Sequence, residues 1–215
     1  MNIIKNYTEI LNQIKKNTNL NPQVIAVSKT FDLDHIRPLI NFGHLHYGEN
    51  RVNEAVLKWS NEIKKNLNLK IHLLGKLQSN KIKDALKIFS YIHSLDSKKL
   101  AILLDEEQNK RLINIKYFIQ VNIGNENQKS GIMINDLDDF INFCRSKTKL
   151  NIVGLMCIPP IKESPDFYFK KLSEMAKKNN LDELSMGMSN DYISGIKNGS
   201  TFVRIGSAIF GERSN

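Results

Sequence analysis

Short apolar runs alternate with longer amphipathic segments along this sequence. Most of the runs end in polar residues, and each is followed by a segment whose apolar positions recur every three or four residues. The first pattern is typical of a buried parallel strand, and the second of a helix that covers it. We expect strands at residues 24–27, 45–47, 71–74, 90–93, 117–122, 152–156, 183–186 and 202–205. We expect helices at residues 2–16, 32–41, 51–66, 80–89, 97–109, 136–147, 165–178 and 191–198.

This alternation predicts the fold class. Eight strands that alternate with helices favour a closed parallel (β/α)8 barrel of the TIM type, here with an extra helix at the N-terminus. No linker, low-complexity tract or change of composition divides the sequence, so we expect one domain over residues 1–215. In such a barrel, functional residues lie at the carboxyl ends of the strands. Glycine and polar residues gather there, at 28–30, 48–50, 75–81, 93–96, 187–189 and 206–207.

Composition narrows the classes of function. No apolar run approaches the ~20 residues of a membrane span, and the N-terminus lacks the apolar segment of a secretory signal, so we expect a cytoplasmic protein with no membrane contact. Cys144 and Cys157 lack the spacing of metal ligands and are expected to be reduced, buried thiols. The net charge is +9, but the lysines are scattered without interleaved aromatic residues, so we expect no nucleic-acid partner.

Residues 24–30 place an amine at the end of the first predicted strand. Four apolar residues are followed directly by Ser28, Lys29 and Thr30. A lysine held against apolar walls loses hydration, which lowers its pKa and makes it a better nucleophile toward an aldehyde. Lys29 is therefore a candidate Schiff-base lysine. The alternative is a solvated lysine that only ends a strand, because most lysines are exposed.

Two strand-to-helix turns have the features of an anion site. Residues 185–191 pass through a glycine and two serines, and residues 203–211 form the turn after the last strand, where barrels frequently bind phosphate. Free backbone N–H groups at such turns attract anions, although N-capping by Ser189 or Asn190 explains the first turn equally well. Arg204 alternates with apolar neighbours on the last strand, so we expect it to point into the barrel mouth and to donate hydrogen bonds there.

Taken together, these segments resemble one known family. A close resemblance to the pyridoxal 5′-phosphate (PLP) homeostasis proteins runs through residues 24–30, 46–50, 72–75, 77–81, 120–122, 129–131, 154–156 and 184–211. Its most specific parts are residues 184–189 and 199–213. The resemblance implies a barrel like the N-terminal domain of alanine racemase, with PLP bound as a Schiff base on Lys29.

The resemblance also implies how the rest of the cofactor is held. Ser189 and the backbone of Gly206 and Ser207 would bind the phosphate, and Arg204 would face the pyridine nitrogen. Ser207 stands where the family usually has threonine, which keeps both the hydroxyl and the N–H group.

Three further residues are implied near the ring. Asn50 and His72 would lie beside it, and Met186 belongs to the same expected set of cofactor-binding residues. No metal site is expected. Lys129, in the loop after the fifth strand, is a candidate for a secondary PLP site, although a solvated loop lysine is the alternative.

Two functions are compatible with this resemblance. The first is a carrier that holds PLP and passes it to apo forms of PLP enzymes, without amino-acid turnover; we expect it to be a monomer. The second is a PLP-dependent racemase or decarboxylase of the alanine racemase type. Racemisation needs proton donors on both faces of the substrate, and in alanine racemase a tyrosine from a second domain serves one face. The sequence ends at Asn215, after the last strand, and an arginine at the pyridine nitrogen weakens the cofactor as an electron sink, so we expect the carrier.

Overall fold

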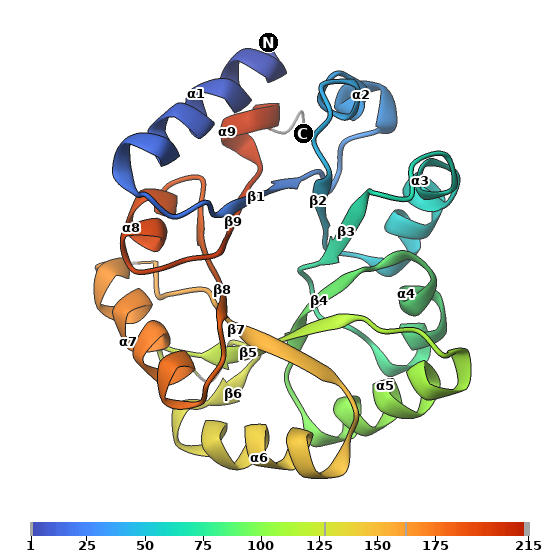
Figure 1. Cartoon of the computed structure of the whole chain (residues 1–215), viewed down its shortest axis with the longest axis vertical. Helices are drawn as coiled ribbons and strands as arrows, with labels where there is room; N and C mark the ends of the chain where they lie inside the picture. Colours follow the sequence, from blue (N-terminus) through green and yellow to red (C-terminus); the bar gives the residue numbers. More distant parts are fainter. Residues whose placement is uncertain (1, 127, 162, 213–215) are drawn as a thin grey trace.

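The parallel strands close into a barrel in the computed structural model (Figure 1), which describes residues 2–126, 128–161 and 163–212. The strands follow the order β4-β3-β2-β1-β9-β8-β7-β5, and pairing of β4 with β5 closes the ring. The predicted barrel is therefore confirmed. The strands are β1 (Gln23–Val27), β2 (His46–Glu49), β3 (Lys70–Leu73), β4 (Tyr91–Leu95), β5 (Lys116–Asn122), β6 (Ile132–Met133), β7 (Asn151–Cys157), β8 (Glu183–Met188) and β9 (Phe202–Ile205).

Helices surround the barrel on the outside, as Figure 1 shows. They are α1 (Ile3–Asn17), α2 (Leu33–Asn41), α3 (Val52–Lys65), α4 (Ile82–Ile88), α5 (Lys98–Arg111), α6 (Leu137–Lys147), α7 (Pro165–Lys178), α8 (Tyr192–Lys197) and α9 (Ser207–Phe210), with 3₁₀ turns at Ser79–Lys81 and Ile134–Asp136. The expected extra helix is α1, which precedes β1 and lies against α8 and α9. Asn2 caps it by accepting a hydrogen bond from the backbone N–H of Lys5.

The structure adds small elements that the sequence pattern did not predict. Strand β6 has two residues and pairs with β5 at the end of the strand order, outside the closed ring. The helix expected at residues 80–89 begins as a 3₁₀ turn and becomes regular only in α4. Helix α2 runs through Pro38 without a break. The loss of one hydrogen bond at Pro38 is thus tolerated, because the buried residues Ile36 and Leu39 hold this helix against the sheet.

The core has two layers, and strand periodicity decides which residues enter each one. Side chains alternate between the two faces of a strand. On β1, Val24 and Ala26 join the large core between sheet and helices, whereas Ile25 packs inside the barrel with Phe118 and Phe202. On β1, every second residue from Ile25 faces the barrel interior, so residues 27 and 29 continue this inward series. On β9, the inward series runs from residue 202 through 204 to 206. These two series end at the mouth of the barrel.

Candidate functional site

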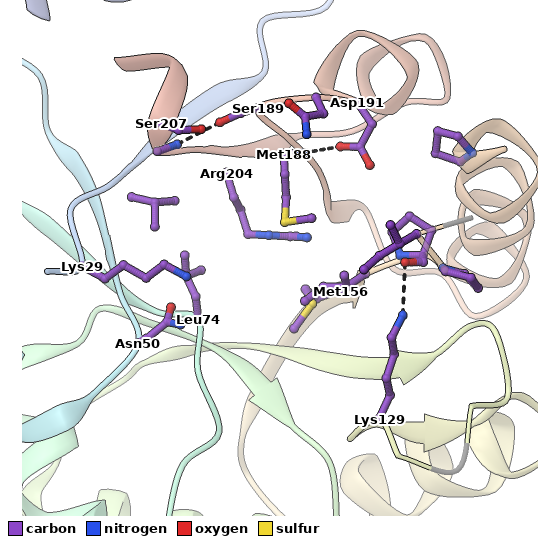
Figure 2. Close-up of a pocket in the computed structure, with 18 of the residues that line it drawn as sticks. Lys29, Asn50, Leu74, Lys129, Met156, Met188, Ser189, Asp191, Arg204 and Ser207 are labelled. Atoms are coloured by element: carbon purple, nitrogen blue, oxygen red, sulfur yellow. Dashed lines mark hydrogen bonds between the residues drawn. The ribbon is translucent and has the colours of Figure 1, made fainter. Parts of the chain in front are cut away.

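A pocket of about 930 Å³ lies at the carboxyl ends of the strands. Figure 2 shows Lys29 and Arg204 extending into the same space, from the end of β1 and from β9. Six of the eight residues expected to bind the cofactor line this pocket: Lys29, Asn50, Ser189, Arg204, Gly206 and Ser207. The topology thus gathers into one cavity residues that are up to 178 positions apart in the sequence (29 to 207).

Lys29 is held by a turn with unusual backbone geometry. The next residue, Thr30, has a φ of 72°, in the left-handed region that costs a β-branched residue about 1–2 kcal/mol. The preceding residue, Ser28, is fully buried, and its N–H donates to the carbonyl of Gly48. The half-buried Lys29 therefore lies between an anchored residue, Ser28, and a strained one, Thr30.

A buried ion pair fixes the backbone just before Lys29. The carboxylate of Glu49 is fully buried, and its Oε1 accepts hydrogen bonds from Lys58 Nζ at 2.9 Å, Ser28 Oγ at 2.8 Å and Trp59 Nε1 at 3.0 Å. The same Lys58 amine donates to the carbonyl of Ser28 at 2.9 Å. The peptide group between Ser28 and Lys29 is thus tied to α3, which limits where the Lys29 side chain can start.

Arg204 brings a buried positive charge to the floor of the pocket. Only 5% of its surface is exposed. Its Nη1 donates to the Ser185 carbonyl at 2.5 Å and to Ser185 Oγ at 2.8 Å, and Nη2 donates to the Cys157 carbonyl at 2.8 Å. Burial lowers the pKa of this guanidinium, and burial raises the pKa of the neighbouring Cys157 thiol to about 12. No carboxylate among the described residues forms a salt bridge with Arg204, so its hydrogen-bond acceptors are all neutral, while the Asp191 carboxylate favours its charge at longer range.

Backbone N–H groups converge on one hydroxyl at the other side of the pocket. Ser189 Oγ accepts from the N–H of Gly206 at 3.3 Å and from that of Ala208 at 3.5 Å, which are long distances for such bonds. The turn after β8 reaches this position through Gly187, whose φ of 90° excludes most side chains. The hydroxyl therefore lies where donors from the turn after β9 meet, and a stronger acceptor would compete well for them.

Asn50 enters the pocket because two loops approach each other closely. It follows β2 and lies on the inward series of His46 and Gly48. A Cβ atom at Gly75 would lie 2.2 Å from the Asn50 carbonyl oxygen, so only glycine allows the loop after β3 to pass there. The carboxamide thus faces the cavity from a tightly packed loop.

Two of the expected residues do not line the pocket. His72 is fully buried inside the barrel, one layer below the mouth. Leu74, two residues further along the chain, lines the pocket in its place. Met186 is fully buried in the core between sheet and helices, whereas Met188 lines the cavity. His72 lies on the inward face but at a greater depth than the mouth. Met186 and Met188 would share a face in a regular strand, but β8 has a register irregularity between Ser185 and Met188, where Gly187 has a φ of 90°, and this separates the two side chains.

The sequence did not predict that the rest of the pocket wall is apolar. Its apolar side is formed by Met156, near the end of β7, and by Ile158, Pro159 and Pro160, which follow that strand. The candidate residue Lys129 also lines the cavity; its Nζ donates to the Pro159 carbonyl at 3.2 Å and pairs with Glu126 at 2.5 Å. An apolar wall facing a row of polar donors suits a flat, partly polar ligand.

Two other expectations concern the cysteines and the membrane. Cys144 and Cys157 are free and buried, as predicted. Within residues 2–126, 128–161 and 163–212, no helix is both long enough and apolar enough to cross a membrane.

The chain matches a family model over almost its whole length. The model, described as alanine racemase, N-terminal domain, covers residues 2–214. Alanine racemase from Corynebacterium glutamicum has the same fold, with a TM-score of 0.69 at 16% identity over 99% of this chain and 61% of the enzyme. This barrel therefore belongs to the alanine racemase N-terminal domain family.

More similar relatives identify the branch of that family. The pyridoxal phosphate homeostasis protein of Aquifex aeolicus is 38% identical over 89% of this chain and 87% of its own length, and that of Escherichia coli K12 is 35% identical over 88% and 85%. The structure of PipY from Synechococcus elongatus without PLP gives a TM-score of 0.89 at 33% identity, over 97% of this chain and 100% of PipY. A second PipY structure has PLP bound and gives a TM-score of 0.83 at the same identity, over 94% and 99%. The chain belongs with the pyridoxal phosphate homeostasis proteins, as its sequence motifs predicted.

Proposed function

We propose that this protein binds PLP as a Schiff base on Lys29, holds it in reserve and releases it to apo forms of PLP enzymes. The observation that carries the proposal is the convergence of Lys29 and Arg204 on one pocket with an anion-suited turn at its side. Support comes from the family of homeostasis proteins and from PipY, whose structure has PLP bound.

The residues present fit the chemical groups of PLP. An aldehyde needs an amine, which Lys29 supplies from the end of β1. A phosphate needs several N–H and hydroxyl donors, and the N–H groups of Gly206 and Ala208 already meet at Ser189 Oγ. A pyridine nitrogen needs a hydrogen-bond donor. Arg204 has N–H groups on Nε and Nη2 beyond those bonded to described residues, and it lines the same cavity.

Each residue then has a defined task. Lys29 Nζ would hold the cofactor through a C=N bond to its aldehyde carbon, the aldehyde oxygen leaving as water with both hydrogens of the neutral amine. Arg204 orients the ring by donating to its nitrogen and, because an arginine cannot give up its proton, leaves that nitrogen unprotonated. Ser189 turns its hydroxyl to the phosphate, and the N–H groups of Gly206 and Ser207 add donors. When bound, the cofactor would supply an electron sink, which an unprotonated ring nitrogen weakens.

The other ionisable groups of the pocket support storage over turnover. No tyrosine, histidine or cysteine is among the described residues that line it. Glu163 accepts the hydroxyl of Tyr168, and Asp191 accepts the backbone N–H of Met188, so both carboxylates have structural tasks. Lys129 is paired with Glu126. Glu163, Asp191 and Lys129 are thus weak candidates for the second proton donor opposite Lys29 that racemisation requires, and Glu212 is the remaining carboxylate of the described lining.

The covalent bond to Lys29 is tested with borohydride, which fixes a C=N bond as a stable amine. We expect wild-type protein incubated with PLP to show a visible imine band and, after reduction and digestion, a mass adduct on the peptide that contains Lys29. Lys29→Ala should lose both. Lys76→Ala is a matched control at the same end of the barrel, because Lys76 is 68% exposed and lies outside the pocket, and it should keep both. An adduct on Lys129 or Lys81 with none on Lys29 would refute the assignment.

Storage and turnover are separated by a second measurement. The PLP-loaded protein is incubated with L- and D-amino acids in deuterated water, and exchange at the α-carbon is followed by NMR. It is then mixed with an apo PLP enzyme whose recovered activity is assayed. We expect recovery of that enzyme without α-carbon exchange. Rapid exchange that disappears in Lys29→Ala would instead establish a racemase or decarboxylase.

A further inference from the structure

A row of hydrogen-bonded polar side chains crosses the barrel interior below the pocket. His46 on β2 contacts His72 on β3, with Nδ1 and Nε2 2.9 Å apart. His72 Nδ1 lies 2.9 Å from Nε2 of His93 on β4, and His93 Nδ1 lies 2.9 Å from Oγ of Ser185 on β8. Ser185 in turn accepts a hydrogen bond from Arg204. This histidine row therefore connects the lower end of the barrel with the arginine at the pocket floor.

The positions of the hydrogen atoms along the row can be assigned by starting from Arg204. His72, His93 and Ser185 are fully buried, and burial holds the pKa of both imidazoles well below the ordinary value, so each ring is neutral with one donor and one acceptor. Arg204 can only donate, so Ser185 Oγ accepts from it and has one hydrogen left to give. Among the described residues, His93 Nδ1 is the acceptor in reach of that hydrogen.

The order then propagates along the row. His93 must donate from Nε2 to His72 Nδ1, and His72 must donate from Nε2 to His46 Nδ1. The reverse order would leave the Ser185 hydrogen buried without an acceptor, which costs about 1–3 kcal/mol. All three histidines are therefore expected to carry their proton on Nε2.

Aromatic neighbours prevent the rings from rotating out of this arrangement. His72 stacks on Tyr91 with ring centres 4.3 Å apart and an interplanar angle of 11°. His93 stacks on Phe118 at 4.3 Å and 15°. The row is thus a rigid support, and its end, Ser185 Oγ, is fixed as an acceptor directed at Arg204.

We propose that Ser185 and His93 are positioning residues for Arg204, fixing the guanidinium so that its remaining N–H groups face the pocket. The proposal rests on the proposed function in one respect, that the group facing Arg204 is the ring nitrogen of PLP. Because Arg204 has no carboxylate partner among the described residues, its orientation depends on the three acceptors supplied by Ser185 and Cys157. A donation from Ser185 to His93 also polarises the hydroxyl and strengthens it as an acceptor.

The order of the row is measured without any cofactor. In apo protein with ¹⁵N-labelled histidine and arginine, NMR at neutral pH should show the Nε2–H form for His46, His72 and His93 and a slowly exchanging Nε–H signal for Arg204. Ser185→Ala should shift that arginine signal and speed its exchange. Ser94→Ala is the matched control, because Ser94 is an equally buried strand serine whose hydroxyl has no partner among the described residues. An Nδ1–H form at His93, or an Arg204 signal unchanged in Ser185→Ala, would overturn the proposal.

The consequence for the pocket is measured with two probes that differ in one atom. PLP and its 1-deaza analogue, in which C–H replaces the ring nitrogen, have the same aldehyde and phosphate. Wild-type protein should prefer PLP by about tenfold or more, the worth of one charged hydrogen bond. Ser185→Ala and His93→Phe should reduce this ratio, whereas Ser94→Ala should preserve it.

The outcomes separate this proposal from the proposed function. Equal weakening of both probes in Ser185→Ala would mean general loosening of the barrel and would refute positioning. A wild type that binds both probes equally would refute contact between Arg204 and the ring nitrogen, while leaving PLP binding intact. A wild type that binds neither probe would refute the proposed function, and the histidine and arginine NMR signals would still decide whether the row orders Arg204.

Discussion

The buried pair between Lys58 and Glu49 allows a quantitative test of how the Lys29 turn is held. Lys58→Met keeps the length and apolar stem of the side chain but removes the amine that contacts the Glu49 carboxylate and the Ser28 carbonyl. Glu49 is 0% exposed and the Lys58 side chain only 11%, so water cannot replace the lost partner. Leaving a buried carboxylate unpaired costs about 3–5 kcal/mol. For a chain of 215 residues this corresponds to a fall in Tm of about 6–20 °C.

The assay is urea unfolding followed by circular dichroism, with Lys87→Met as the control. Lys87 pairs with Asp84 at 2.8 Å, close to the 2.9 Å of the buried pair, but the side chains of both residues are about half exposed. Since solvent screens that pair, the control should unfold near the wild-type midpoint. The double variant Glu49→Gln/Lys58→Met removes both charges while keeping an acceptor for Ser28 and Trp59, so it should be more stable than Lys58→Met alone. Equal midpoints for Lys58→Met and Lys87→Met would refute the reasoning.

Three further outcomes are expected. Leu112→Gly should raise the free energy of unfolding by about 1 kcal/mol in thermal melts, because Leu112 ends α5 at a φ of 52° with its side chain 93% exposed; an unchanged Tm would contradict this. Stability should fall from pH 6.5 to pH 4, with His44 contributing about 3 kcal/mol: burial lowers the pKa of His44 to about 4, so in this window the unfolded chain takes up a proton that the folded chain refuses. His72 and His93, whose pKa values burial also lowers, act in the same direction, so His44→Gln should make the profile shallower without abolishing it. Pyridoxal without phosphate should bind about 100-fold more weakly than PLP in spectral titrations, since the donors around Ser189 would lose their acceptor; equal affinities would argue against that phosphate site.

Much of the barrel follows from local pattern, and the parts that do not follow have physical reasons. The eight strands of the closed ring lie where apolar runs predicted them, because a strand buried on both faces needs such a run. Strand β6 was not predicted, since two residues carry no periodicity. The unpredicted α9 is a single turn of helix after Gly206, which is too short for an amphipathic pattern.

The same limit applies to the site. The position of Lys29 could be predicted because residues 25, 27 and 29 share one face of a strand whose end is obvious. The sequence did not show which of Met186 and Met188 lines the pocket, because the surrounding polar residues did not fix the end or the register of β8. The ion pair between Glu49 and Lys58 could not be predicted from the sequence either. Charged residues are usually exposed, and nothing in the neighbouring residues indicates that these two are buried.

The electrostatics of the pocket floor explain why an arginine suits the proposed storage of PLP. Arg204 keeps its charge although it is buried, and the imidazoles behind it are neutral, so the groups that it hydrogen-bonds are dipoles and the Asp191 carboxylate acts on it without a salt bridge. A neutral ring nitrogen can accept from this guanidinium, and a phosphate held at the turn of Ser189 adds the negative charge that the floor lacks. A carboxylate in place of Arg204 would instead favour a protonated ring nitrogen and a stronger electron sink. In the proposed site, the residue that would add affinity for the cofactor would therefore also reduce the cofactor's reactivity.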